Sequence, residues 1–371
     1  MRDGARHLYV HLPFCASRCG YCDFVTVVGH GDRHVAYVDA LLGELALERR
    51  LLAPGLESIY LGGGTPSLTA PHELERLLAA LPAAQEVTVE ANPETVTPAL
   101  AALLSRSRVD RVSIGAQTFN TALLDVLDRR ARPGDVRRAM HRLRDVGIDN
   151  RSLDLIYGIP GQTPADLSRD LDEALDLEPE HISAYELEAK PGTRFTHAHG
   201  AELLRQADQL ESYMEVVVER LTTAGYRWYE TANFCLGSDR AGGRDLRARH
   251  NLGYWLGRDY LGLGVGAVST IENRRWRNAP SLHGYLVAHG RRERPQRELE
   301  TLSPSDQATE RVMLGLRLDE PLPLDGLGHV VDLDALGRLA AGGLAVHGQG
   351  SVTLTPRGRL LGGGVTARLL A

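Results

Sequence analysis

The sequence predicts an α/β protein in which a partial (β/α)6 TIM-like barrel is followed by a small C-terminal winged-helix-like domain. Short apolar runs alternate with helix-period stretches through the first half of the chain, as in a parallel sheet covered by helices. Polar and glycine residues gather where these runs end, and the pattern changes after Glu188. The alternation also fits a doubly wound sheet, but six strand–helix units favour a barrel with a gap.

Six strands and six helices make up the predicted barrel. The strands are Leu8–Leu12, Ser58–Leu61, Val87–Glu90, Arg111–Gly115, Ser152–Tyr157 and His181–Leu187. The helices between them are Val35–Leu52, His72–Leu81, Pro98–Leu104, Thr121–Leu127, Val136–Val146 and Pro164–Leu175. The last helix opens with Thr163-Pro-Ala-Asp166, a capping-box-like start with proline at the first helical position.

The rest of the chain predicts two further segments. For residues 191–300 we expect a long helix over Gln206–Thr223, an aromatic strand over Gly225–Phe234, and the segment His250-Asn-Leu-Gly-Tyr-Trp255. For residues 301–371 we expect helices at Asp306–Leu316 and Leu333–Ala341, a hairpin through Leu344–Thr355 and a final helix. The predicted domains are therefore 1–190, 191–300 and 301–371.

The composition is that of a soluble globular protein, with 371 residues, 43% of them hydrophobic and 24% charged. A net charge of −6 argues against nucleic acid as the main partner, because phosphate binding relies on Lys and Arg. Lys190 is the sole lysine, which excludes a Walker A phosphate loop. Because neither a secretory signal nor a membrane-spanning stretch is recognisable, we expect a cytoplasmic protein with reduced thiols.

Three of the 4 cysteines stand within eight residues, in Cys15-Ala-Ser-Arg-Cys19-Gly-Tyr-Cys22. They follow a strand-like run, so their thiolates lie on a short loop and can converge on one metal centre. Closed zinc sites and cubane iron–sulfur clusters normally take four protein ligands. Three thiolates therefore leave one coordination position open for chemistry.

Conspicuous residues also stand at or just past the ends of the other predicted strands. They are the Gly62-Gly-Gly-Thr-Pro-Ser67 turn, Glu90-Ala-Asn-Pro93, Gln117 and Asp154-Leu-Ile-Tyr157-Gly158. Because the carboxyl ends of parallel strands form one face, we expect a polar ligand-binding rim beside the cysteines. The glycine run lets backbone approach a small ligand that carries amino and carboxylate groups.

Simpler interpretations stay open at this point. The cysteines could form a zinc site completed by Cys235 or a histidine, although their spacing matches the usual paired motifs poorly. Cys235 by itself is typical of a small buried apolar residue. His250 is one of 14 histidines and stands among aromatic residues that commonly pack a core, although an exposed histidine can ligate haem or a metal.

Together, these motifs resemble the radical S-adenosylmethionine (SAM) superfamily. Within it the chain is similar to the HemW haem-chaperone branch, whose near relatives are the oxygen-independent coproporphyrinogen III oxidases. Beyond the cysteine motif, the resemblance rests on Tyr9-Val-His-Leu-Pro-Phe-Cys15, Ser113-Ile-Gly-Ala-Gln117-Thr-Phe119, Asp154-Leu-Ile-Tyr-Gly-Ile-Pro160 and Arg249-His-Asn-Leu-Gly-Tyr-Trp255. It covers nearly the whole length of the chain.

The resemblance implies a [4Fe–4S] cluster on Cys15, Cys19 and Cys22, with SAM chelated by the open iron. It also implies SAM contacts from Tyr9, Gly63, Gly64, Thr65, Glu90, Gln117, Arg129 and Asp154. His250 is then the leading candidate haem ligand, and client haemoproteins, membrane-associated respiratory enzymes among them, would receive the haem. A homodimer and peripheral membrane association are further expectations of the resemblance.

Two departures favour a chaperone over an oxidase that would oxidise coproporphyrinogen III with a SAM-derived radical. The oxidases carry a fourth nearby cysteine where this chain has Phe24, and a longer segment before the first cysteine than the fourteen residues here. SAM cleavage stays open, whereas coproporphyrinogen III oxidation is not expected. Gly266-Ala-Val268 replaces the Gly-Ala-His of many members, which puts a second histidine-dependent contact in doubt. A zinc-stabilised regulator that binds nucleic acid through its C-terminal domain is disfavoured by the negative net charge.

Overall fold

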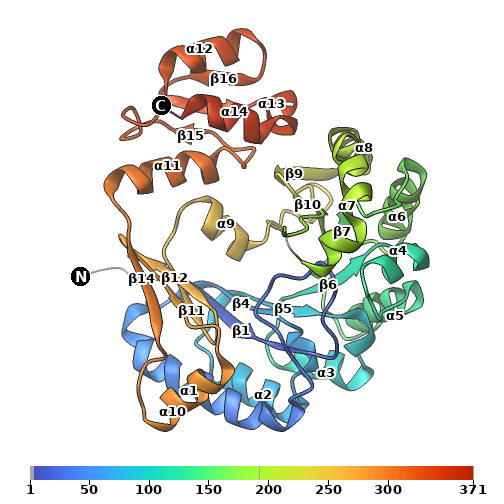
Figure 1. The fold of residues 1–371 in the computed structure, drawn as a ribbon, viewed down its shortest axis with the longest axis vertical. Coiled ribbons are helices and arrows are strands. Elements are labelled where there is room, and N and C mark those ends of the chain that lie inside the picture. The colour runs from blue at the N-terminus through green and yellow to red at the C-terminus, as the bar shows by residue number, and fades with distance from the viewer. Residues whose placement is uncertain (1–3, 192, 371) are drawn as a thin grey trace.

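The computed structural model describes residues 4–191 and 193–370. Six parallel strands form the body of its sheet: β1 (His7–Leu12), β4 (Leu56–Gly63), β5 (Ala84–Ala91), β6 (Arg111–Gln117), β7 (Arg151–Tyr157) and β8 (His181–Glu186). Each pairs with the next in chain order, which confirms the predicted six-unit partial barrel (Figure 1). A doubly wound sheet would instead reverse its strand order at a switch point.

The helices between these strands cover the outside of the sheet (Figure 1). They are α1 (His34–Glu48), α2 (Pro71–Ala80), α3 (Pro98–Arg106), α4 (Thr121–Val126), α5 (Pro133–Asp145) and α6 (Pro164–Asp176). The capping box at Thr163 and Asp166 forms as predicted at the start of α6. The first helix is shorter than predicted, because a 3-10 turn over Arg49–Leu51 follows Glu48.

The strands divide their residues between an apolar core and a polar barrel interior. On β1, Leu8 and Val10 belong to the main hydrophobic core, whereas Tyr9 and His11 hydrogen-bond to each other. This alternation follows from the two-residue period of a strand. A polar interior makes the open end of the barrel a place where polar ligands can bind.

Additional strands extend both edges of the barrel. On one side β11 (Tyr260–Leu263) pairs in parallel with β1, and β12 (Val268–Ile271), β13 (Arg274–Asn278) and β14 (Arg297–Thr301) follow in antiparallel order. On the other side β10 (Asn233–Leu236) pairs with β8, and β9 (Tyr226–Glu230) pairs with β10. The strands of residues 260–301 were not predicted.

Two predicted elements between residues 191 and 236 are wrong in extent. The single strand over Gly225–Phe234 is the hairpin β9–β10, whose turn is fixed because the Glu230 carboxylate accepts hydrogen bonds from the Ala232 N–H and the Asn233 amide. The single helix over Gln206–Thr223 is α7 (Arg194–Ala207) followed by α8 (Leu210–Thr223).

The C-terminal segment has its own hydrophobic core and a three-stranded sheet. Its elements are α11 (Pro304–Gly315), β15 (Leu322–Pro323), α12 (Leu333–Ala341), β16 (Ala345–Gly348), β17 (Ser351–Leu354), α13 (Pro356–Leu360) and α14 (Gly362–Leu369). The order helix, strand, helix, hairpin agrees with the winged-helix-like expectation. Residues 191–300 share the barrel's sheet, and the three domain boundaries stay predictions.

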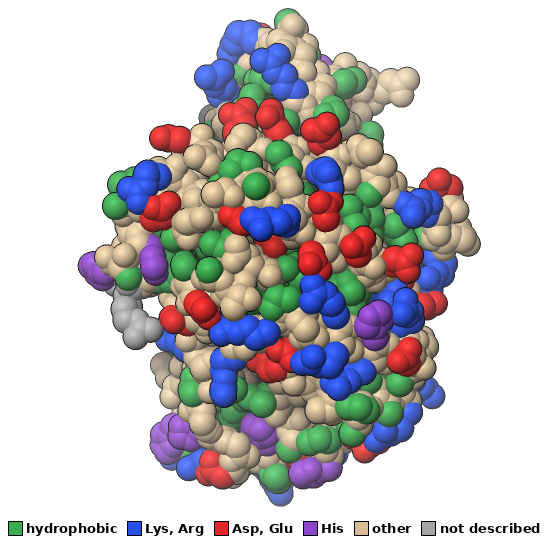
Figure 2. All heavy atoms as spheres, turned by 90° about the vertical axis from the view of Figure 1, so that its right-hand side faces the viewer, with side chains coloured by type: hydrophobic (Ala, Val, Ile, Leu, Met, Phe, Trp, Pro, Cys, Tyr) green, Lys and Arg blue, Asp and Glu red, His purple; other side chains and the backbone are tan. Residues whose placement is uncertain are grey.

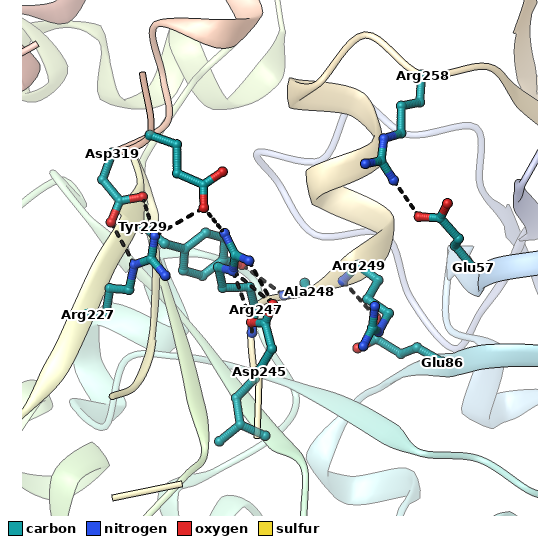
Figure 3. A network of polar contacts seen from close by, with 12 residues as sticks. Glu57, Glu86, Arg227, Tyr229, Asp245, Arg247, Ala248, Arg249, Arg258 and Asp319 are labelled. Atoms are coloured by element: carbon teal, nitrogen blue, oxygen red, sulfur yellow. Dashed lines mark hydrogen bonds and ion pairs between the residues drawn. The ribbon is translucent and has the colours of Figure 1, made fainter. Parts of the chain in front are cut away.

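Ionic and cation–π contacts join the C-terminal segment to the β9–β10 hairpin. Arg227 of β9 forms a two-pronged ion pair with Asp319, at 2.7 and 2.9 Å (Figure 3). The Arg359 guanidinium lies 3.7 Å above the centre of the Trp228 ring. These contacts fix the segment at the edge of the sheet.

The surface gives no sign of one dominant charge on the face that carries α4 to α8. Figure 2 shows acidic and basic side chains interspersed there. Among the helices built from residues 4–191 and 193–370, none has the length and apolar content needed to cross a bilayer.

Candidate functional site

A cavity of about 470 Å³ opens at the carboxyl ends of the parallel strands. It brings together ten of the twelve residues singled out from the sequence. They are Cys15, Cys19, Cys22, Gly63, Gly64, Thr65, Glu90, Gln117, Arg129 and Asp154. Tyr9 and His250 do not line it.

The cysteine loop is closed by a short pair of strands. β2 (Phe14–Cys15) pairs in parallel with β3 (Val27–Val28), which brings the two ends of the loop side by side. All three thiols are free and half-buried, and burial raises the pKa of the Cys15 and Cys22 thiols. A cationic cluster would relieve this cost by stabilising the thiolates.

The zinc alternative finds no closed ligand set in the described part of the chain. Among the described residues, no group of three or more His, Cys, Asp or Glu side chains, the loop cysteines included, is arranged to hold a single metal ion. Cys235 lies buried on β10 and packs in a separate cluster with Tyr229 and Leu246. The cysteine loop can therefore offer three thiol ligands to a metal centre, and Cys235 does not supply a fourth.

The Glu90 carboxylate is buried in the wall of the cavity with a donor on each oxygen. The Tyr60 hydroxyl donates to Oε1 at 2.7 Å, and the Gly63 N–H donates to Oε2 at 3.1 Å. Burial and, to a smaller degree, the charge of Asp154 raise the pKa of Glu90 to about 7. Gly63 has a φ of +115°, and a Cβ there would lie 2.5 Å from the His11 ring. Only glycine offers its N–H to Glu90 in this geometry.

A line of polar contacts links two of the cysteines around the cavity. The Arg129 guanidinium donates to the Cys19 sulfur at 3.7 Å and to the Asn92 side-chain oxygen at 3.0 Å. Asn92 in turn donates to the Thr65 hydroxyl at 3.1 Å, which lies 3.6 Å from the Cys15 sulfur. The Nε atom of Arg129 is buried without a hydrogen-bond partner, so the site has unused donor capacity.

The opposite wall of the cavity is built by β6 and β7. Asp154 accepts hydrogen bonds from the Ser113 hydroxyl at 3.0 Å, and burial raises the pKa of its carboxyl to about 6. Gln117 has a φ of +65°, a strained conformation for a residue with a side chain. Gly115 leaves room for the Gln117 side chain, because a Cβ at Gly115 would lie 2.8 Å from the Gln117 amide nitrogen.

Comparison with known proteins agrees with this geometry. Residues 9–174 match the radical SAM superfamily and residues 302–361 match the HemN C-terminal domain. A protein named heme chaperone HemW from Mycobacterium tuberculosis is 38% identical over 98% of this chain and 94% of its own length. The HemW of Bacillus subtilis is 32% identical, with 98% of each chain covered.

The chain belongs to the haem chaperone HemW family. Its fold is also that of the Escherichia coli coproporphyrinogen III oxidase HemN, with a TM-score of 0.81 over 99% of this chain and 90% of the oxidase. Identity to that oxidase is 22%, so the likeness concerns the fold alone.

In this chain the candidate haem ligand His250 lies behind Tyr60, which lines the cavity. It is 2% exposed, on α9 (Arg249–Trp255). Its Nδ1 atom lies 2.9 Å from the Ser58 hydroxyl and its Nε2 atom lies 2.9 Å from the Tyr254 hydroxyl. Burial and the nearby His7 lower the pKa of His250 to about 3, so the ring is neutral.

Tyr9, the other predicted residue outside the cavity, lies in the same layer. Its ring stacks on Tyr60 at 6.3 Å and its hydroxyl hydrogen-bonds to His11 at 3.0 Å. A role for Tyr9 in contact with SAM stays a prediction. Tyr9 supports Tyr60, which does line the cavity.

The radical SAM domain implies a [4Fe–4S] cluster and SAM, and the residues present fit both. Three free thiols open into the cavity beside the positive charge of Arg129. The buried carboxyls of Glu90 and Asp154 suit the amino and hydroxyl groups of SAM, because a buried acceptor gains most from a donor that comes with the ligand.

Sequence reasoning missed Tyr60 and Ser113, which orient the two carboxyls. Each lies on the same strand as a recognised motif, two residues from Gly62 and Gly115 respectively, and so faces the same side. That two-residue spacing was the available signal.

Proposed function

We propose that this chain is a haem chaperone: a [4Fe–4S] protein that binds SAM at its cluster, holds haem and transfers it to client haemoproteins. The observation that carries the proposal is similarity over nearly the full length to proteins named heme chaperone HemW. Phe24 agrees with it, because it stands on the cavity wall where the oxidases are expected to have a fourth cysteine.

In this proposal Cys15, Cys19 and Cys22 hold the cluster, and Glu90, Gln117 and Asp154 offer polar groups to SAM. When bound, the cluster supplies an open iron that chelates SAM and an electron that can cleave it. Arg129 balances negative charge beside Cys19. Gly63 and Gly64 let this turn pack closely against β1 and the start of the cysteine loop, since a Cβ on Gly63 would lie 2.5 Å from the His11 ring and one on Gly64 would lie 2.5 Å from the Pro13 carbonyl oxygen.

His250 is the proposed haem ligand. A neutral imidazole is the form that binds iron, and the lowered pKa of His250 keeps the ring neutral at physiological pH. Ligation through Nε2 requires that iron replace the Tyr254 hydroxyl. Titration of haem into wild type and His250→Ala tests this role: loss of the Soret change in the variant supports it, and unchanged binding removes His250 from it.

Haem transfer is the direct test of the chaperone function. Protein reconstituted under anaerobic conditions and loaded with haem is mixed with a haem-free peroxidase whose activity returns on loading. We expect activity to appear at the rate at which the Soret band of the donor decays. Formation of protoporphyrinogen IX from coproporphyrinogen III in a parallel assay would overturn the chaperone and establish the oxidase alternative.

The cytoplasmic location, peripheral membrane contact and a haem-linked homodimer complete the proposal. Sedimentation of the reconstituted protein with and without haem measures the homodimer. Flotation with phospholipid vesicles measures the membrane contact. A protein that sediments as a monomer with and without haem would remove the homodimer from the proposal. A protein that does not float with the vesicles would remove the membrane contact.

A further inference from the structure

Tyr60 stands between the cavity and the helix that carries His250. Its hydroxyl donates to Glu90 at 2.7 Å, while Gly63 holds the second oxygen of the same carboxylate at 3.1 Å. With one donor on each oxygen, the carboxylate is fixed in one orientation. Its remaining lone pairs are free to accept from a ligand in the cavity.

The Tyr60 ring is held in place by two other rings that stack against it. The His250 ring stacks on it at 5.1 Å with an interplanar angle of 25°, and Tyr9 stacks on it at 6.3 Å. His250 is held in turn by Ser58 and Tyr254. The Tyr60 hydroxyl therefore has little freedom to leave Glu90.

Helix α9, which supplies this support, is anchored near both ends (Figure 3). At its start the Arg249 N–H donates to Glu86 at 2.9 Å, and the Ala248 N–H donates to the Tyr229 hydroxyl at 3.2 Å. Just beyond its end Arg258 forms an ion pair with Glu57. The rings beneath the cavity thus rest on a fixed element rather than a loop.

Gly62 gives independent support for the importance of this contact. A Cβ at Gly62 would lie 2.8 Å from the Tyr60 ring and 3.1 Å from the Glu90 carboxylate. Its backbone is not in the left-handed region, so conformation alone does not require glycine there. The missing side chain leaves room for the phenol to reach the carboxylate.

We propose that Tyr60 is a positioning residue that orients the Glu90 carboxylate toward a ligand bearing ammonium or hydroxyl groups, which is SAM if the proposed function holds. The inference rests on that function for the identity of the ligand. It gives the buried rings of Tyr9 and His250 a role in supporting the cavity, separate from any contact with haem.

The same contact controls the charge of Glu90. Its hydrogen bond from Tyr60 favours the ionised carboxylate and opposes the effect of burial on the pKa. Burial raises the pKa of Tyr60 well above its ordinary value, so its phenol stays a donor. The titratable groups that act on Glu90 or respond to it are Tyr9, Tyr60, Asp154, Tyr185 and Tyr254. Among them only Asp154 titrates near neutral pH.

The test measures SAM affinity of the reconstituted protein by equilibrium dialysis from about pH 6 to about pH 9, a range that brackets the titration of Glu90. The variants are Tyr60→Phe, Gly62→Ala and Glu90→Gln, with Tyr157→Phe as a matched control. Tyr157 is a buried tyrosine of β7 whose hydroxyl contacts Met214, and it does not line the cavity. Iron content and circular dichroism confirm that each variant is loaded and folded.

We expect wild-type affinity to rise through about pH 7 and Tyr60→Phe to bind about tenfold more weakly, the size of one hydrogen bond to a charged group. Its inflection should move to higher pH, as should that of Gly62→Ala, while Tyr157→Phe should match wild type. The amino group of SAM titrates equally in every protein, so a difference between curves reports Glu90.

Two failures are distinguishable. If Glu90→Gln binds SAM like wild type at every pH, the assignment of this site to SAM fails and the proposed function loses its ligand. If Glu90→Gln weakens binding but Tyr60→Phe matches Tyr157→Phe, the positioning role is overturned while the SAM site stands. A weaker Tyr60→Phe with an unshifted inflection also overturns it.

Discussion

The guanidinium of Arg129 lies 3.7 Å from the sulfur of Cys19, and the same side chain donates to the Gly115 carbonyl at 2.7 Å. One residue therefore ties the cysteine loop to the end of β6. Asn92 and Thr65 continue this line toward Cys15, so polar contacts join the loop to the strand ends without a break. The site is built across the mouth of the barrel, and its residues are predicted to act together.

Arg129 should set the reduction potential of the bound cluster. A positive charge beside a thiolate ligand favours the added electron, so Arg129→Gln should lower the potential by tens of millivolts, where about 59 mV equals a tenfold change for one electron. Redox titration followed by electron paramagnetic resonance measures it. Arg132→Gln, an exposed neighbour that pairs with Asp125, is the control. Equal potentials in the two variants would contradict the role.

Each cysteine of the loop should be required for the cluster. Cys15→Ser, Cys19→Ser and Cys22→Ser should lose most of the iron and sulfide, which wild type should hold at about four atoms each per chain. Cys235→Ser should keep a full complement, because that thiol packs in a separate cluster. Chemical analysis after anaerobic reconstitution gives the numbers. Zinc in place of iron and sulfide, lost from Cys235→Ser as well as from the three loop variants, would favour the zinc alternative.

Gly63→Ala should cost more stability than the same change at Gly147. Both glycines have positive φ, +115° and +82°, so both substitutions strain the backbone. Only at Gly63 does the new Cβ meet a neighbour, the His11 ring at 2.5 Å. We expect about 1 kcal/mol for Gly147→Ala and about 2–4 kcal/mol for Gly63→Ala, measured by urea unfolding. Equal losses would show that the His11 ring gives way freely.

The cofactor-free protein should lose stability as the pH rises from about 4.5 to about 7. Folding raises the pKa of Glu90 from 4.5 to about 7, so the fold favours the protonated carboxyl. Its contribution is fully present below about pH 4.5 and is lost by about pH 7, a change of up to about 3 kcal/mol.

Glu90→Gln should flatten this part of the pH profile while weakening SAM binding. Urea midpoints from about pH 4.5 to above pH 7 measure the effect, and Glu215→Gln on the exposed surface of α8 should follow wild type. A Glu90→Gln profile as steep as that of wild type would place the titrating group elsewhere, with Asp154 as the next candidate.

The barrel was predictable because buried parallel strands appear in the sequence as short apolar runs. The carboxyl ends of these strands all lie on the same face of the barrel. Val112 and Ile114, for example, are fully buried on β6. β13 and β14 were missed because Arg274–Asn278 and Arg297–Thr301 are mostly charged. β14 is the edge strand of the sheet and β13 lies next to it, so many of their side chains face water. Only their pairing shows that they are strands.

Much of the site was predictable for the same reason, since Glu90 and Gln117 lie at the ends of β5 and β6. Asp154 was expected at a strand end but lies in the middle of β7. The layer beneath the cavity was not predictable. Ser58 and His250 touch although 192 residues separate them, and no local pattern carries such a contact. Tyr60 was read as part of a strand, and its link to Glu90 appears only when β4 and β5 pair.

The central claim is that the cysteine loop and the Glu90 rim form one site, in which SAM meets the open iron of the cluster. The most direct measurement is the electron paramagnetic resonance spectrum of the reduced cluster with and without SAM. We predict a clear change of the signal on SAM addition in wild type and Tyr157→Phe, and a much higher SAM requirement in Glu90→Gln. A wild-type spectrum that stays the same at saturating SAM would contradict the account.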